Sequence, residues 1–97
     1  MLSIKQKKFL RGLANPLTNM FQVGKDGISS NQITAVSLAL DSHELLKVGV
    51  LKNCDQEIRE VAFDLASATN AEIVQVIGRT IILYRKSKKN IIQLPKK

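Results

Sequence analysis

Apolar residues along the chain alternate between two periods, and this order limits the folds open to it more than any other feature. Runs typical of β-strands fall at residues 20–23, 44–51, 72–77 and 80–85. Helical periods fall at 3–13, at 29–41, and from a cap at Asn53 or Asp55 to about residue 69. Strand–helix–strand units predict parallel strands, and the closing β–β hairpin reverses the last one. We therefore predict an α/β fold of the α+β two-layer type: an N-terminal helix, then β-α-β-α-β-β, with helices on one face of a mixed four-stranded sheet.

Local signals support the predicted helix boundaries. Two capping-box patterns occur, Ser3 with Gln6 and Ser29 with Gln32. In the first helix we expect a buried face that faces away from most of its cations and is made of Leu2, Phe9, Leu10 and Leu13.

The 97 residues suffice for one domain, which we place at 1–86, followed by a basic tail at 87–97. In that tail we expect loose order, with Ile91, Ile92 and Leu94 able to dock as a short extended segment. The single Cys54 excludes an internal disulfide and a cysteine metal cage, and it suits a reducing compartment. Residues 1–8 lack the apolar core of a signal peptide and no apolar run is long enough for a bilayer, so we expect a cytoplasmic protein with no membrane partner.

Charge is unevenly distributed along the chain, which carries a net +7. Residues 1–25 hold five basic residues and no acid, and residues 79–97 hold seven basic residues and no acid. All eight acids lie within 26–78, where the third helix forms an acidic back. Such segregation favours a polyanionic partner.

The predicted topology gathers three of the cations. Segments that follow strands of the same direction leave the sheet at the same edge. The loop at 24–27, the turn at 52–53 and the hairpin at 78–79 should therefore meet, which brings Lys25, Lys52 and Arg79 together along one rim.

Gly24 and Gly27 bracket a loop between a strand and a capped helix. Glycines permit close backbone approach, and a helix start presents free N–H groups, so this arrangement suits a phosphate of a nucleic-acid backbone. Lys25 adds a cation, whereas Asp26 would repel phosphate and should point away or shape the turn. The alternative is a tight turn that needs glycine for its own conformation.

Catalytic and cofactor patterns are weak. His43 stands beside Glu44 without a nucleophile or a second carboxylate, and no phosphate loop, dinucleotide fingerprint or metal-ligand spacing occurs. Tyr84 suits packing better than base stacking. We expect a non-enzymatic protein with no cofactor, no metal and no small-molecule substrate, whose contacts go to the RNA backbone rather than to bases.

Four blocks of the sequence carry a family resemblance: residues 9–14, 23–28, 43–48, and 74–80 with 83–85. They resemble the CRM domain, the chloroplast RNA splicing and ribosome maturation family, in its bacterial stand-alone, YhbY-like form. The resemblance implies a fold similar to the C-terminal domain of translation initiation factor three, with strand order 1-2-4-3. Gly49 departs from the family pattern, which often places another cation there.

The resemblance also implies a function. It implies RNA binding through Gly24, Lys25 and Gly27, with Arg11, Lys47, Arg79 and Arg85 as the family's basic positions. From their places in the loop, the first helix and the rim, we add Asp26, Lys5, Lys8 and Lys52 as candidate RNA contacts. Bacterial members are associated with large-subunit precursors, so ribosomal RNA or such precursor particles are the expected partners. The alternatives are a DNA architectural protein and a module that docks an acidic protein partner.

Overall fold

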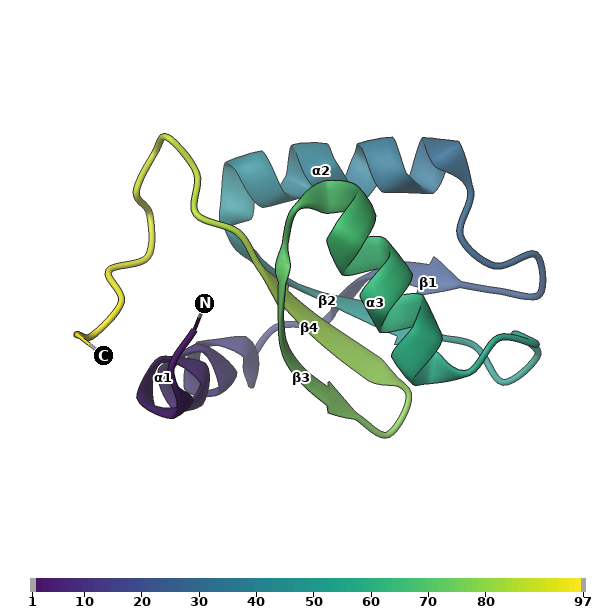
Figure 1. Cartoon of the computed structure of the whole chain (residues 1–97), viewed down its shortest axis with the longest axis horizontal. Helices are drawn as coiled ribbons and strands as arrows, with labels where there is room; N and C mark the ends of the chain where they lie inside the picture. Colours follow the sequence, from purple (N-terminus) through teal and green to yellow (C-terminus); the bar gives the residue numbers. More distant parts are fainter. Residues whose placement is uncertain (1, 97) are drawn as a thin grey trace.

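The computed structural model describes residues 2–96 and contains the predicted elements in the predicted order (Figure 1). They are α1 (Ile4–Ala14), β1 (Asn19–Val23), α2 (Ser30–His43), β2 (Leu45–Val50), α3 (Ile58–Thr69), β3 (Glu72–Ile77) and β4 (Thr80–Tyr84). The largest boundary difference is the start of α3, which lies after Asn53 and Asp55 rather than at either. There the Cys54 N–H closes a turn onto the Leu51 carbonyl at 3.1 Å, and residues 51–57 carry the chain from the sheet to the helix layer.

The four strands form one mixed sheet in the order β1-β2-β4-β3. β1 and β2 are parallel, and β4 is antiparallel to both of its neighbours. The strand order implied by the family resemblance and the strand directions expected from the sequence pattern are both confirmed.

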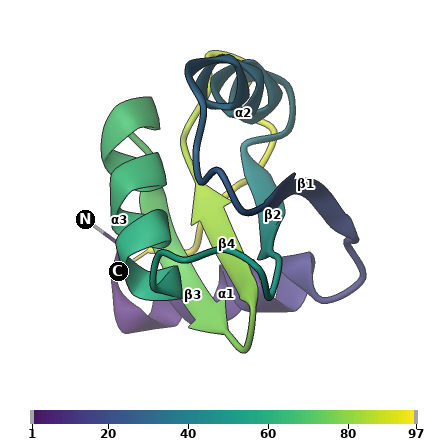
Figure 2. The ribbon, with the colours of Figure 1, turned by 90° about the vertical axis from the view of Figure 1, so that its right-hand side faces the viewer.

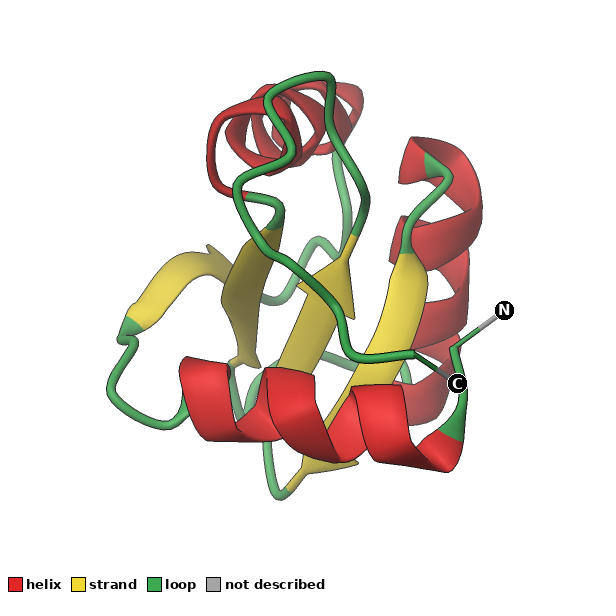
Figure 3. Cartoon of the chain, turned by 90° about the vertical axis from the view of Figure 1, so that its left-hand side faces the viewer, coloured by secondary structure: helices red, strands yellow, loops and turns green. Residues whose placement is uncertain are grey.

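The sheet has an apolar cluster on each face. The first cluster joins α2 and α3 to one face, with Val36, Leu40 and Leu65 fully buried in it. The second joins α1 to the opposite face through Leu10 and Ala14. Figure 3 shows α1 lying across the sheet on the side away from α2 and α3. The expectation of helices on one face therefore holds for α2 and α3 but is wrong for α1.

The buried face of α1 also differs from the prediction. Gln6, Leu10 and Ala14 face the sheet at four-residue spacing, while Phe9 is 40% and Leu13 42% exposed. A polar residue is tolerated on this face because the Gln6 side chain is satisfied: its oxygen accepts from Ser3 N–H, and its Nε2 donates to the Pro95 carbonyl.

Both predicted serine caps form. Ser3 makes the full capping box with Gln6. Ser29 accepts from the Gln32 N–H, but the Gln32 side chain donates to the Gln22 carbonyl of β1 instead of closing the box. This bond ties the start of α2 to the strand that precedes it.

Residues 86–96, which we call the strap, run back over the α1 side of the sheet. Ile92 and Leu94 pack against the second apolar cluster. In Figure 1 the strap and α1 lie at one end of the molecule. Among residues 2–96, no helix has the length and apolar character needed to cross a membrane.

Candidate nucleic-acid interface

The three loops predicted to meet do meet. We use "the rim" for residues 24–27, 51–57 and 78–79. The Leu51 N–H donates to the Val23 carbonyl at 2.8 Å, and the Val50 N–H donates to the Arg79 carbonyl at 2.8 Å. Figure 2 views the molecule from this end. The parallel pairing of β1 and β2 causes the convergence, because their last residues, Val23 and Val50, are register partners.

The glycine loop is a hydrogen-bonded turn. The Gly27 N–H donates to the Gly24 carbonyl at 3.0 Å, which places Lys25 and Asp26 at its two exposed corners. Gly27 has a φ of 72°, a conformation that strains other residues. A side chain at Gly24 would meet only the Leu51 Cδ1, at an ordinary contact distance of 3.6 Å. The turn therefore explains Gly27, whereas the fold makes no demand for glycine at position 24.

The rim is mixed in charge. Its cations are Lys25, Lys52 and Arg79, and its acids are Asp26, Asp55 and Glu57, all of them exposed. Arg79 is already engaged, because its Nε donates to the Val50 carbonyl at 2.8 Å and its Nη2 to the Leu51 carbonyl at 2.6 Å. What the rim offers an anion is mainly backbone geometry: a glycine turn leading into the N-terminus of α2.

The α1 cations lie away from the glycine loop. Lys5 and Lys8 are exposed and Arg11 is half-buried. Lys8 and Arg11 line a shallow groove of about 410 Å³ between α1 and the β3 edge, the edge opposite β1 and its loop. Gln75 also lines this groove, and its Oε1 is buried with no hydrogen-bond partner in the structure. The groove therefore combines two cations with an unsatisfied acceptor.

One of the predicted site residues, Lys47, has a structural role. The Lys47 Nζ donates to the Leu17 carbonyl at 3.1 Å and to the Asn15 carbonyl at 3.5 Å, which secures the connection between α1 and β1. Gly49, two residues further along β2, leaves room for the side chains of Asn19 and Gln22. The departure from the family pattern therefore places neutral amides at this position.

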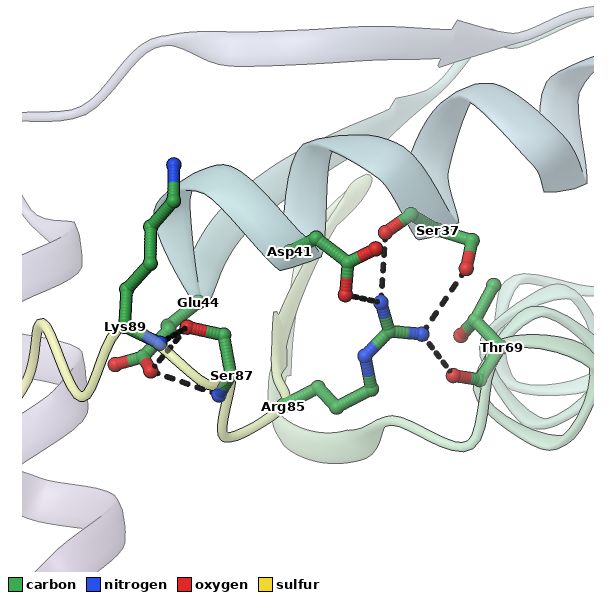
Figure 4. Close-up of polar contacts among 7 residues, drawn as sticks. All are labelled: Ser37, Asp41, Glu44, Thr69, Arg85, Ser87 and Lys89. Atoms are coloured by element: carbon green, nitrogen blue, oxygen red, sulfur yellow. Dashed lines mark hydrogen bonds and ion pairs between the residues drawn. The ribbon is translucent and has the colours of Figure 1, made fainter.

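Arg85 links α2 to the end of α3 (Figure 4). Its Nη1 donates to the Ser37 hydroxyl at 3.1 Å and to the Thr69 carbonyl at 2.6 Å. Its Nη2 donates to the Ser37 carbonyl at 2.7 Å and pairs with Asp41 at 2.8 Å. Arg85 follows β4, whose other end is at the rim, so the structure does not bring it to the glycine loop.

Glu44 is a structural residue that the sequence reasoning missed. It is fully buried with a φ of 64°. Its carboxylate accepts from the Ser87 N–H at 2.8 Å and the Ser87 hydroxyl at 2.7 Å (Figure 4), and from the Ile92 N–H at 2.7 Å. Burial alone would raise the pKa of this carboxyl, but the bonds from Ile92 and Ser87 outweigh it, so the pKa lies below its usual value. The one available signal was an acid at the start of an apolar strand. Its carboxylate faces the strap, while the neighbouring His43 is exposed at the end of α2.

Other candidate groups have plain structural surroundings. Tyr84 is buried in the second apolar cluster, which confirms packing over base stacking. Burial raises the pKa of its hydroxyl, and the charges of Glu44 and Glu72 add to the effect. Cys54 is a half-buried free thiol. Within residues 2–96 no three His, Cys, Asp or Glu side chains lie close enough to hold a metal ion.

Comparisons with known proteins give consistent matches along the chain. The model of the CRS1/YhbY (CRM) domain matches residues 2–85. Probable RNA-binding protein YqeI of Bacillus subtilis is 48% identical over 98% of this chain and 100% of its own length. A Haemophilus influenzae protein named RNA-binding protein is 39% identical over 99% of this chain and 97% of its own. The solution structure of a Staphylococcus aureus hypothetical protein matches 98% of this chain and 100% of its own at 47% identity, with a TM-score of 0.83.

Proposed function

The chain belongs to the CRS1/YhbY (CRM) domain family, and from that premise we propose that it binds structured RNA through the phosphate backbone. Membership confirms the resemblance inferred from the four sequence blocks. The matched Bacillus and Haemophilus proteins are named as RNA-binding proteins and are covered almost end to end, which supports the same role here.

The main observation that supports the proposal is the positive charge of α1. The helix holds Lys5, Lys7, Lys8 and Arg11 and no acid, on the face of the sheet opposite the acid-bearing α3. A helix with four cations on one side, and a helix with two acids and one cation on the other, give the molecule a field that orients it on a polyanion. Phosphate contacts then supply affinity and register.

The glycine loop supplies a second type of contact. Gly24 has no steric reason to be glycine, so its missing side chain is available for close approach of a sugar–phosphate backbone. The free N–H groups at the start of α2 and the Lys25 ammonium would bind one phosphate there. We expect little base readout at this loop, because no aromatic side chain lies within residues 24–27.

The finer role we propose is that of an assembly factor in the cytoplasm, contacting ribosomal RNA of the large-subunit precursor. Family membership supports this role. Crosslinking in cells followed by sequencing of bound RNA tests it, and we expect precursor large-subunit RNA to dominate the crosslinked reads. A crosslinked pool spread over messenger RNA in proportion to abundance would contradict it.

Salt dependence of binding tests the backbone mode itself. We expect Lys8→Ala to reduce the log–log salt slope by about 0.7–0.9, because one phosphate contact is lost. Arg59→Ala is the matched control, since it removes one exposed cation from α3 and should leave the slope unchanged. Equal salt slopes for the wild type, Lys8→Ala and Arg59→Ala would contradict the proposal. Competition by duplex DNA as strong as that by structured RNA at matched salt would also contradict it.

A further inference from the structure

The strap is held against the body of the protein at several points. Glu44 accepts three hydrogen bonds from Ser87 and Ile92, and Gln6 donates to the Pro95 carbonyl at 3.0 Å. Ile92 and Leu94 add apolar contacts to the second cluster. These contacts hold residues 86–96, with the cations that they carry, against the α1 side of the sheet.

The strap carries exposed cations and no acid: Lys86, Lys88, Lys89 and Lys96. In Figure 4 the Lys89 side chain extends away from the Glu44 carboxylate. The neighbouring acids are already engaged: Asp41 pairs with Arg85 at 2.8 Å, Glu44 is buried under the strap, and Glu72 accepts from the Leu2 N–H at 3.0 Å.

Position separates this surface from the rim. The rim loops lie at one end of the molecule, and the strap with α1 lies at the other (Figure 1). The longest dimension is 38 Å. β4 shows the same separation, since it begins beside the rim at Thr80 and ends at Tyr84, just before the strap.

We infer that the strap and α1 together form a second RNA-backbone surface, which we call the basic end. The protein then bridges two backbone segments of one folded RNA, one at the glycine loop and one at the basic end. This inference rests on the proposed function and adds to it a ligand class: an RNA whose structure presents phosphates at both ends of the molecule. A short RNA that reaches only one end binds more weakly.

A pair of double variants of the full chain tests the inference. Lys88→Ala with Lys89→Ala and Lys25→Ala with Lys52→Ala each lower the net charge by two, the first at the strap and the second at the rim. The probe is an RNA hairpin whose duplex is longer than the protein, measured by fluorescence anisotropy across a salt series. We expect each variant to bind on the order of tenfold more weakly at low salt, with a slope reduced by about 1.4–1.8.

The outcomes separate this inference from the proposed function. If the strap variant binds like the wild type while the rim variant and Lys8→Ala are weakened, the basic end does not include the strap and RNA binding stands. If all three variants bind like the wild type, the proposed function fails as well.

Glu44→Gln tests whether position matters as well as charge. The amide places an NH₂ group against N–H or O–H donors in either orientation, so at least one strap bond is lost. The substitution raises the net charge by one, so bulk electrostatics predicts tighter binding, whereas release of the strap predicts binding a few-fold weaker. Binding at wild-type strength or tighter, with amide exchange at Ile92 showing that the strap is released, would overturn the inference. The lysine variants leave the Glu44 contacts intact, so they test the inference even if Glu44→Gln does not fold.

Discussion

The rim and the basic end differ in how each could attract an anion. The rim has a glycine turn and a helix N-terminus, but its three cations stand among three acids. The basic end has no recognisable motif, yet it brings together cations from the first and last segments of the chain with no acid in either segment. The rim could attract an anion mainly through its backbone geometry, and the basic end mainly through its accumulated positive charge.

A sequence motif and an electrostatic surface are therefore separate properties of this protein. The glycine motif is local, so four residues of sequence reveal it. The basic end depends on Glu44 holding residues 86–96 beside α1, an arrangement made by contacts more than 40 residues apart along the chain. The largest predicted effects concern the residues that build the two regions, and the smallest concern the charges displayed on them.

Arg85→Ala has the largest expected effect, and the effect is on stability. We expect a loss of about 2–4 kcal/mol in the free energy of unfolding, because three hydrogen bonds to Ser37 and Thr69 disappear together with the ion pair to the exposed Asp41 carboxylate. Denaturant unfolding measures it, with the exposed Lys88→Ala as a control that should unfold like the wild type. Unchanged stability of Arg85→Ala together with weakened RNA binding would make Arg85 a ligand contact and extend the basic end.

Acidification should release the strap. The pKa of Glu44 is held below its ordinary value of 4.5, so its contribution is present above that value and is lost as pH falls through the lower folded pKa. We expect the amide of Ile92 to lose protection from exchange in this window while the amides of β4 stay protected. Glu44→Gln should abolish the pH dependence of this exchange. Retention of the transition in that variant would assign it to another group.

Much of this structure follows from local patterns. Apolar periods, serine caps and the handedness of crossovers predict the elements, the sheet and the meeting of the rim loops. The side of the sheet that α1 covers does not follow, because Gln6 is buried only with help from Pro95. The structural roles of Lys47 and Arg85 were equally hidden, since an arginine bound to four groups and a free arginine look the same in sequence.

Substitutions of the two loop glycines should have different effects on stability and on RNA binding. Gly27→Ala should lower stability by about 1–2 kcal/mol, because its φ of 72° disfavours a side chain. Gly24→Ala should leave stability nearly unchanged but weaken binding of the long RNA hairpin, since only the ligand needs that space. Thermal unfolding and anisotropy distinguish the two effects. If Gly24→Ala binds RNA with wild-type affinity, the loop is a structural turn and not an RNA contact.

Neutralising the charges of Lys25 and Asp26 at the loop corners has the smallest expected effects. Lys25→Ala should weaken binding across RNA sequences alike and lower the salt slope by about 0.7–0.9. Asp26→Asn should strengthen RNA binding a few-fold at low salt, because it removes the negative charge beside the RNA phosphate that we place at the glycine loop. Isothermal titration at two salt concentrations measures both. A change in sequence preference for either variant would indicate base readout at the loop.

Amide chemical-shift mapping of the labelled protein with the long RNA hairpin shows which surfaces of the protein contact the RNA. We predict perturbations at α1, at residues 24–27 and at Lys88 and Lys89, with the exposed side of α3 around Glu60 and Asp64 unaffected. Perturbations confined to α3, or to the rim alone, would contradict RNA binding at two opposite ends of the molecule.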